Sequence, residues 1–200
     1  MNLREQLGPA LRATLVTLVL TGIGYPLLAT GLARTIFPHQ SGGSLVKDDG
    51  GRVVGSELIA QAFSLPGYFQ PRPSAAGDKG WDAVASGGSN LGPTSKKLRE
   101  RAAADVARLL EENPTAARPI PAELVAASGS GLDPHLSPEA AEWQIERVAA
   151  ARQVSPDRVR VVVQDAIEGR DLGFLGERRV NVLLLNLSLD LKLGKPVSPR

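Results

Sequence analysis

Residues 13–33 constrain this chain more than any other stretch. They read ATLVTLVLTGIGYPLLATGLA and contain no charged side chain, while Arg12 precedes them and Arg34 follows them. As a helix with a rise of ~1.5 Å per residue, the stretch covers the ~30 Å hydrocarbon core of a bilayer. We therefore predict a short N-terminal tail (1–12), one transmembrane helix (13–33) in contact with the lipid bilayer, and a single globular domain (34–200).

Two other interpretations of this stretch stay open. A cleaved signal peptide also has basic residues before its apolar region and small residues after it, but that region is shorter, at ~7–15 residues. A buried helix of a soluble protein is the third interpretation. Arg4, Arg12 and Arg34 do not decide on which side of a membrane the domain lies, because long domains largely escape the positive-inside rule.

Mostly small residues recur at spacings of three and four along the predicted span. The positions are Thr14, Thr17, Thr21, Gly24, Leu28 and Gly31. Such spacing places residues on one seam of a helix, and small residues let neighbouring helices approach closely within lipid. We predict that Thr14, Thr17, Thr21, Gly24 and Gly31 form a docking face for other membrane helices. The alternative is that these residue types are simply common in membrane helices. Pro26 is expected to kink the span.

The composition excludes several classes of function. The chain of 200 residues has no cysteine, two histidines and a formal net charge of +2. Disulfides, thiolate metal sites and cysteine nucleophiles are therefore excluded, and we expect no metal site. Lysine and arginine are dispersed among acidic residues rather than clustered, so we expect no nucleic-acid partner. The ~165 residues outside the tail and the span suit one domain with its own core.

The pattern after residue 34 predicts an α+β domain, so the expected fold class is a membrane-anchored α+β protein. A short hairpin is expected at 45–46 and 53–54, and residues 55–63 suit either a strand or a helix. Residues 64–93 are rich in Pro, Gly and Ser but carry Tyr68, Phe69 and Trp81, which predicts an ordered loop. Residues 180–193 alternate leucine with polar residues, which favours a strand and leaves a helix open.

Three helices are expected between these segments. The first has Thr94 as its N-cap, an apolar stripe, and its end at Asn113-Pro114. The second follows Ser137 and runs to about Arg152, and the third follows Ser155 and stops near Gly169. Their predicted buried residues are Leu98, Ala102, Val106, Leu109 and Leu110 in the first, Ala140, Ala141, Gln144, Ile145, Val148 and Ala149 in the second, and Val159, Val162, Val163, Ala166 and Ile167 in the third.

A glycine-rich loop is the first candidate for chemistry. Ser86, Gly87, Gly88, Ser89 and Asn90 resemble the Ser-Gly-Gly-Gln signature of transporter ATPases, and backbone N–H groups in such a turn can cradle an anion. The chain has no Walker lysine motif, so a polar turn that holds its own backbone is the simpler interpretation.

Other polar residues suggest weaker alternatives. His135, Asp133 and Ser128 or Ser130 are the residue types of a hydrolase triad, without a nucleophile elbow. Arg72 and Arg147 stand among small or apolar neighbours, where either is expected to pair with a carboxylate such as Asp133. A role in an ion pathway is the alternative. Asn181 and Asn186 are expected to satisfy backbone groups.

Taken together, a series of motifs resembles one family over nearly the whole chain. They are Thr21-Gly22-x-x-Tyr25-Pro26-Leu27, Phe37-Pro38-x-Gln40, Gly43-Ser44-Leu45, Gly55-Ser56-x-Leu58-Ile59, Tyr68-Phe69-x-x-Arg72-Pro73-Ser74-Ala75, Ser86-Gly87-Gly88-Ser89-Asn90-Leu91-Gly92-Pro93, Ser128-Gly129-Ser130-Gly131-Leu132-Asp133-Pro134-His135, Leu172-Gly173-x-Leu175-Gly176 and Val180-Asn181-Val182-Leu183. The chain resembles the C subunit of the Kdp high-affinity potassium-transporting P-type ATPase.

That resemblance implies an accessory subunit that does not hydrolyse ATP itself. Its implied partners are a channel-like potassium-binding subunit and an ATP-hydrolysing P-type subunit, in the cytoplasmic membrane of a bacterium or archaeon. The family has been described as a catalytic chaperone that raises the ATP affinity of the P-type subunit, which would give Ser86–Asn90 a nucleotide role. An outer-face position of the domain is also implied, and ATP is not available there. We favour the outer position and expect no cofactor bound by the chain alone, with ATP entering through the complex.

Overall fold

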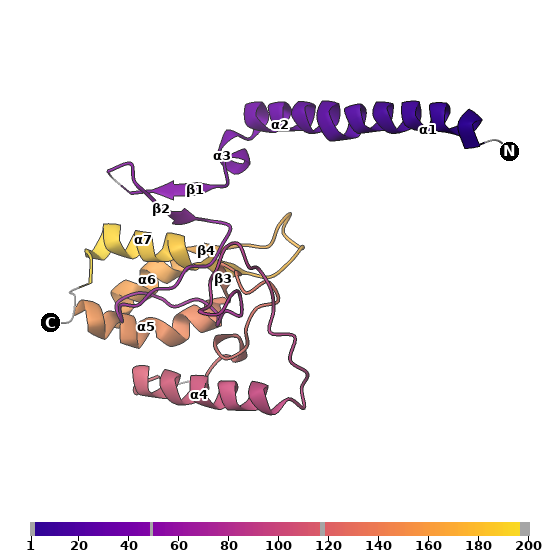
Figure 1. Cartoon of the computed structure of the whole chain (residues 1–200). Helices are drawn as coiled ribbons and strands as arrows, with labels where there is room; N and C mark the ends of the chain where they lie inside the picture. Colours follow the sequence, from indigo (N-terminus) through magenta and orange to yellow (C-terminus); the bar gives the residue numbers. More distant parts are fainter. Residues whose placement is uncertain (1–2, 49, 117–118, 197–200) are drawn as a thin grey trace. The chain divides into compact units, whose positions relative to one another are not determined.

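The computed structural model describes residues 3–48, 50–116 and 119–196 (Figure 1). By contacts the chain divides into two compact units, Met1–Leu45 and Val46–Arg200. The first unit consists of α1 (Leu3–Thr17), the π-helix η1 (Leu18–Gly24), α2 (Tyr25–Ile36) and the short α3 (Pro38–Ser41). The first three elements follow one another without a break, so residues 3–36 form one continuous helical rod.

The π-helix η1 ends directly before Tyr25-Pro26. The Tyr25 N–H bonds the carbonyl of Leu20, five residues earlier, instead of the residue four earlier. Proline lacks an N–H and clashes with the carbonyl four residues before it, so it disturbs the regular ladder at this place. The irregularity that Pro26 was expected to cause therefore takes the form of a wider helical turn.

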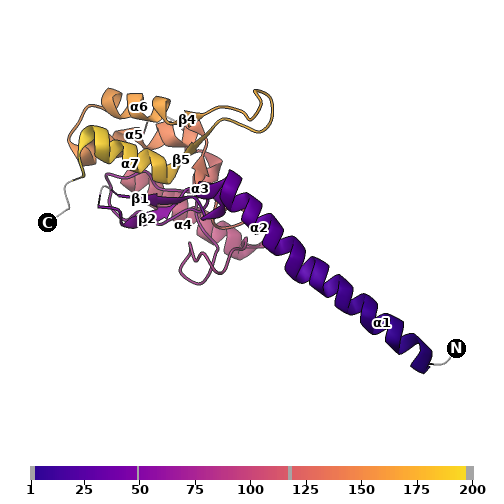
Figure 2. The ribbon, with the colours of Figure 1, turned by 90° about the horizontal axis from the view of Figure 1, so that it is seen from above.

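The second unit combines two small sheets with helices. Its elements are β1 (Leu45–Lys47), β2 (Val53–Ser56), α4 (Lys96–Glu112), the 3-10 helix η2 (Ala122–Leu124), β3 (His135–Leu136), α5 (Pro138–Arg152), α6 (Pro156–Asp165), β4 (Ile167–Glu168), β5 (Arg179–Asn181) and α7 (Val182–Leu193). Strands β1 and β2 pair, and β5 lies between β3 and β4 in an antiparallel sheet in which Leu136 and Ile167 both face Val180. Helix α6 packs against α5 and α7 (Figure 2).

The three predicted helices are confirmed, with corrections to two of their ends and to the buried face of the first. Ser95 rather than Thr94 caps α4, accepting a hydrogen bond from the Leu98 N–H at 3.4 Å. Of the five residues predicted to face inward, Leu109 is buried against the core, Leu98, Ala102 and Val106 are half-buried, and Leu110 is exposed. In α5, all the residues that were expected to face inward are buried. The third helix ends at Asp165 and not near Gly169, because Ala166 is its C-cap and Ile167 begins β4. Its three valines are buried, and Ala166 and Ile167 are partly buried against the core.

The strand prediction for residues 180–193 is wrong beyond residue 181. Strand β5 ends at Asn181, whose side chain accepts a hydrogen bond from the Leu184 N–H and so caps α7. Positions 182, 185, 186 and 189 are buried, and this spacing is helical. The leucines therefore fit both the two-residue repeat of a strand and the 3.6-residue repeat of a helix. The Asn181 cap favours the helix.

An irregular segment, Pro66–Gln70, places Phe69 in the core and has its main chain bound by side chains. The carbonyls of Pro66 and Tyr68 accept hydrogen bonds from Arg147 at 2.6 and 3.0 Å, and that of Gly67 accepts one from Arg152 at 2.7 Å. Asn186 bonds both the N–H and the carbonyl of Phe69, and Gln144 does the same for Gln70. Buried main-chain polar groups need partners, and here α5 and α7 supply them in place of a sheet.

Arg152 joins this segment to the last helix. Its guanidinium, 1% exposed, donates to Gly67, to the Gly194 carbonyl and to Asp190 at 2.8 Å, and it lies 5.1 Å from the centre of the Tyr68 ring. The Tyr68 hydroxyl donates to the other Asp190 oxygen at 2.8 Å. Burial, and then the neighbouring carboxylate, raises the pKa of Tyr68 to about 12, so this hydroxyl keeps its proton at neutral pH.

We expect Arg152→Lys to destabilise the second unit by about 3 kcal/mol, because a point ammonium cannot replace three bonds from one rigid guanidinium. The free energy of unfolding, followed by near-UV circular dichroism of the full chain in micelles, measures the change. Arg158→Lys, at an exposed position six residues later, is the matched control and should stay within about 0.5 kcal/mol. Equal effects of the two variants would contradict the role assigned to Arg152.

Candidate functional site

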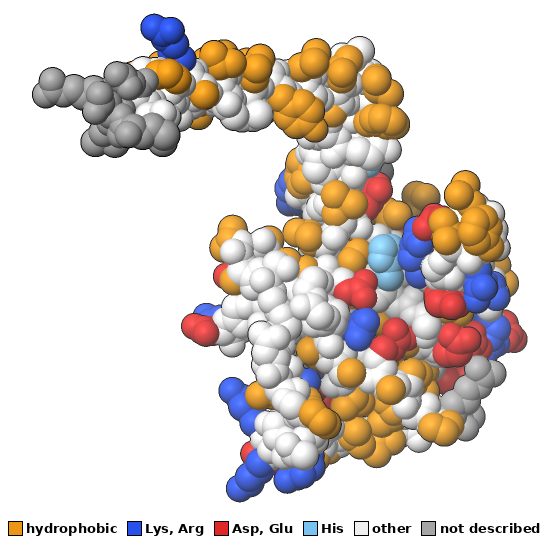
Figure 3. Space-filling view, turned by 90° about the vertical axis from the view of Figure 1, so that its right-hand side faces the viewer, with side chains coloured by type: hydrophobic (Ala, Val, Ile, Leu, Met, Phe, Trp, Pro, Cys, Tyr) orange, Lys and Arg blue, Asp and Glu red, His pale blue; other side chains and the backbone are white. Residues whose placement is uncertain are grey.

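The apolar helix is the first functional feature. Residues Gln6–Ile36 form a helix of 31 residues, with a mean hydropathy of 1.7 in an apolar window that is not buried at all. Figure 3 shows hydrophobic side chains spread along it, whereas charged side chains gather on the second unit. The helix is long and apolar enough to cross a membrane, in agreement with the predicted span at 13–33.

The π-helix changes how the predicted docking residues are arranged. An α-helix turns by ~100° per residue, and a π-helical turn accommodates one extra residue, so the helix after η1 is rotated by roughly 100° relative to a regular helix. Thr14, Thr17 and Thr21 lie before or within η1, and Gly24 and Gly31 lie at its end or beyond. The five residues thus divide into a threonine face and a glycine face rather than one seam. Their role in docking stays a prediction.

The Ser86–Asn90 loop lies against the loop at 128–131. The Gly87 N–H and the Ser86 hydroxyl both donate to the Ser130 carbonyl, at 2.8 and 3.0 Å. A methyl group on Gly88 would come within 2.9 Å of the Gly129 carbonyl oxygen, so only glycine fits this contact. Two of the loop's donors therefore serve its own fold. The nucleotide role of Ser86, Gly87, Gly88, Ser89 and Asn90 stays a prediction.

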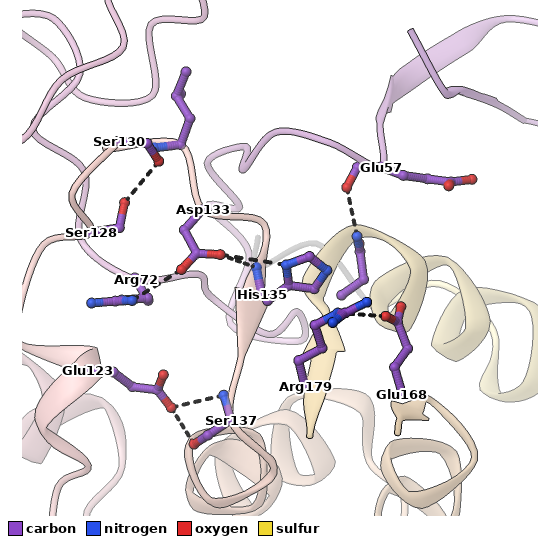
Figure 4. Close-up of polar contacts among 12 residues, drawn as sticks. Glu57, Arg72, Glu123, Ser128, Ser130, Asp133, His135, Ser137, Glu168 and Arg179 are labelled. Carbon is purple, nitrogen blue, oxygen red and sulfur yellow. Dashed lines mark hydrogen bonds and ion pairs between the residues drawn. The ribbon is translucent and has the colours of Figure 1, made fainter. Parts of the chain in front are cut away.

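A polar cluster around Asp133 is the second feature (Figure 4). Asp133 accepts a hydrogen bond from Arg72 at 3.1 Å and another from the His135 main-chain N–H at 3.1 Å, and the His135 Nδ1 lies 3.6 Å from the same carboxylate. The His135 side chain, its N–H and Arg72 together hold the pKa of Asp133 below its usual range. The expected Arg72–Asp133 pair is confirmed. Arg147 was expected to pair with a carboxylate, and this is wrong, because it binds main-chain carbonyls and Gln144.

Of the residues of the hydrolase alternative, Asp133 and His135 lie side by side, whereas the two serines make other contacts. Ser128 and Ser130 contact each other at 3.5 Å, and the Ser130 hydroxyl accepts a hydrogen bond from the Leu132 N–H. In Figure 4 both serines lie on the far side of Asp133 from His135. A nucleophile and its base need to lie within hydrogen-bond reach, and within the described ranges no bond joins His135 to either serine.

The remaining contacts of the cluster tie distant segments of the second unit together. Asn181 donates to the Glu57 carbonyl at 2.8 Å, as expected for a residue that satisfies the backbone, and Asn186 does so at Phe69. Glu123 accepts from the main chain and the hydroxyl of Ser137, and so fixes the start of α5. Among the residues that the structure describes, no group of three or more His, Cys, Asp or Glu side chains is placed to hold a metal ion.

The sequence predicted that Gln144 would be buried but did not identify its hydrogen-bond partners. The spacing of residues did indicate that such partners exist, because Gln144 and Arg147 both fall on or beside the apolar face of α5. Polar side chains at core-facing positions need buried partners. The partners here are carbonyls of a loop more than 70 residues earlier, which no local pattern could have identified.

Comparison with known proteins agrees with this arrangement. The family described as "KdpC: K+-transporting ATPase, c chain" matches residues 7–191. A "Potassium-transporting ATPase KdpC subunit" of Myxococcus xanthus is 64% identical over 185 residues, which is 92% of this chain and 87% of that protein. Proteins of the same name from Sorangium cellulosum and Rhodospirillum rubrum are 55% and 52% identical over 184 residues each, or 92% of this chain and 96% and 94% of theirs.

The fold and the site define a class of protein first. A helix able to span a membrane carries a small domain of helices and two sheets, whose buried charged groups mostly hold its own main chain. The family match covers most of the chain, and the sequence identities to its members are high. The chain belongs to the KdpC family.

We expect Asp133→Asn to lower the free energy of unfolding by about 1 kcal/mol at neutral pH, because the partly exposed carboxylate loses its charge-assisted bonds. The folded-state pKa of Asp133 lies below its unfolded value of ~3.9, so its contribution is complete above that pH and is lost as the pH falls through the folded pKa. The difference between the variant and the wild type should therefore vanish in strong acid.

Denaturant unfolding of the full chain between pH 2.5 and 7 measures this difference. Asp157→Asn is the control, because its carboxylate is 88% exposed and contributes little. A difference for Asp133→Asn that stays constant with pH would show that the loss does not come from its charge.

Proposed function

We propose that this chain is an accessory, non-hydrolysing subunit of an ATP-driven high-affinity potassium uptake pump. The observation that carries the proposal is the family match over residues 7–191, which covers both the apolar helix and the domain. The relatives are named as subunits of a potassium-transporting ATPase, and that name implies that other chains complete the pump. ATP hydrolysis is assigned to one of those partners.

Two partners are proposed for the chain in the cell membrane. One is a channel-like subunit that binds potassium, and the other is the P-type subunit that hydrolyses ATP. The small residues on the apolar helix support helix-to-helix docking, because close backbone approach compensates for the missing hydrophobic driving force in lipid. Since η1 separates the threonine face from the glycine face, the two faces suit two different neighbours.

The domain is proposed to lie on the outer face of the membrane of a bacterium or archaeon. In that position it would promote assembly and activity through contacts with its partners, and a catalytic-chaperone effect on ATP affinity would be transmitted through the P-type subunit. The hydrogen bonds from Ser86 and Gly87 to Ser130 favour this over direct nucleotide binding, since these donors are already used.

Leucine at both Thr21 and Gly24 should weaken recovery of the other pump subunits with this chain by about tenfold, because added side chains keep helices apart at a cost of 1–2 kcal/mol. Affinity purification of the complex in mild detergent measures recovery. Val16→Leu with Val19→Leu, on the same helix, is the control and should leave recovery unchanged.

The two single variants separate the faces. If each face contacts its own neighbour, Thr21→Leu and Gly24→Leu reduce recovery of different subunits. Full recovery of both partners with the double variant would rule out the docking faces.

Orientation is testable because the chain has no native cysteine. Val84→Cys places one thiol at a side chain that is 95% exposed, and Gln6→Cys places one at the other end of the apolar helix. With the domain outside, an impermeant thiol reagent labels intact cells at position 84 and not at position 6, while both react after lysis. Labelling of position 6 alone would place the domain inside and restore a nucleotide role for Ser86–Asn90.

A further inference from the structure

The loop between β4 and β5, residues 169–178, exposes apolar side chains that the rest of the second unit leaves uncovered. Every residue of this β4–β5 loop is exposed, and Leu172, Phe174 and Leu175 are 83%, 69% and 49% exposed. In Figures 1 and 2 the loop stands out from the body of the second unit. Single exposed leucines are common, whereas three large apolar side chains within four residues of one loop indicate an interaction site.

Hydrogen bonds and an ion pair give the loop a defined shape. The main chains of Asp171 and Leu175 exchange two hydrogen bonds, each of 2.9 Å, and Arg170 pairs with Glu177 across the loop at 2.7 Å. Leu172 has a φ of +53°, which is uncommon for a leucine. Because the main chain is held in this way, the apolar side chains at the tip point outward and do not fold back onto the domain.

The charges beside the tip cancel one another. The loop contains Arg170 and Arg178 together with Asp171 and Glu177, so its formal net charge is zero. Glu177 is paired with Arg170, and Asp171 is paired with Arg179 at 3.3 Å. A loop of this kind binds a surface through its apolar area, because it gains no net attraction to a charged one.

The base of the loop lies beside the segment through which the chain enters the second unit. Strand β5 follows the loop and ends at Asn181, which donates to the Glu57 carbonyl at 2.8 Å. Glu57 directly follows β2, and β2 pairs with β1, which begins at Leu45. Residues 37–45 join this entry to the apolar helix, which ends at Ile36, and they span at most ~35 Å. A bilayer that holds the apolar helix therefore stays close to this end of the domain.

We propose that the tip of the β4–β5 loop inserts into the lipid surface of the membrane that holds the apolar helix. Leu172, Phe174 and Leu175 enter the boundary between headgroups and acyl chains, where aromatic and aliphatic side chains are favoured, and the flanking ion pairs stay at headgroup level. The domain thereby gains a second contact with the membrane, which fixes its rotation about the connection to the apolar helix.

Lipid is favoured over a partner protein as the occupant, because the tip lies at the tethered end of the domain, where lipid is present without any partner. The inference rests on the proposed membrane location of the chain and not on the identity of its pump partners.

A tryptophan at the tip tests the insertion. The full chain with Phe174→Trp is placed, one chain per disc, in nanodiscs of zwitterionic lipid brominated near the headgroup end of the acyl chains. Bromine quenches nearby indoles, and the wild type measures the background from Trp81 and Trp143. We expect the emission from position 174 to fall by about half, because an interfacial group lies ~5–10 Å below the headgroup boundary.

Two further positions serve as references. Val84→Trp is the matched control, because Val84 is 95% exposed on another loop of the same unit, and its emission should not change. Ile23→Trp lies in the predicted span and should be quenched by lipid brominated near the ends of the acyl chains. The second reference reads the membrane location of the apolar helix separately from the β4–β5 loop.

A polar tip separates the effect of the loop from that of the introduced indole. Leu172→Asn with Leu175→Gln, added to Phe174→Trp, should abolish quenching at position 174. Near-UV circular dichroism should stay unchanged, since the replaced side chains are exposed. Quenching that persists in this variant would come from the indole alone and overturns the proposal.

The remaining outcomes are equally decisive. Equal quenching at position 174 in zwitterionic discs and in discs with phosphatidylglycerol supports insertion through apolar area, whereas quenching only with phosphatidylglycerol overturns it. Quenching at position 23 without quenching at position 174 overturns the loop contact and leaves the membrane location intact. Absence of quenching at both positions overturns the two together. Quenching at position 84 as strong as at position 174 shows a non-specific approach of the domain and also overturns the proposal.

Discussion

The second unit depends on the binding of five consecutive main-chain carbonyls, from Pro66 to Gln70, by side chains. In most cores a buried extended segment is satisfied by a neighbouring strand. Here Gln144, Arg147 and Arg152 of α5, with Asn186 of α7, replace that strand. Because each of these side chains has a fixed reach, the two helices cannot slide relative to the segment. Polar residues thus contribute to the geometry of a core that otherwise consists of aliphatic side chains with Phe69 and Trp143.

The same segment connects the core to the surface features. Gln70 is bound by Gln144 through its main chain and holds Arg108 of α4 through its side chain. Two residues later, Arg72 pairs with Asp133. One short stretch, residues 66–72, therefore contacts both α4 and the Asp133 cluster.

Local patterns predicted local features well. The inward residues of α5, including Gln144, and the backbone role of Asn186 follow from helical spacing and from the cost of burying an amide alone. Prediction from the sequence failed at 182–193, where the leucine spacing fits both a strand and a helix. It also failed at Arg147, because the hydrogen-bond partners of this side chain are distant in the sequence. The binding of the Pro66–Gln70 carbonyls was beyond prediction, because their partners come from helices that only the folded chain brings next to this segment. The nucleotide loop and the docking faces remain predictions.

The order of synthesis gives the carbonyl-binding arrangement a further consequence. Asn186 and Asp190 lie near the end of the 200-residue chain, yet they bind Phe69 and Arg152 in the middle of the domain. The apolar helix, in contrast, is complete once the first 36 residues have been made. A ribosome therefore completes the apolar helix long before it makes the α7 side chains, so the contacts of α7 with the Pro66–Gln70 segment are the last of these to become possible.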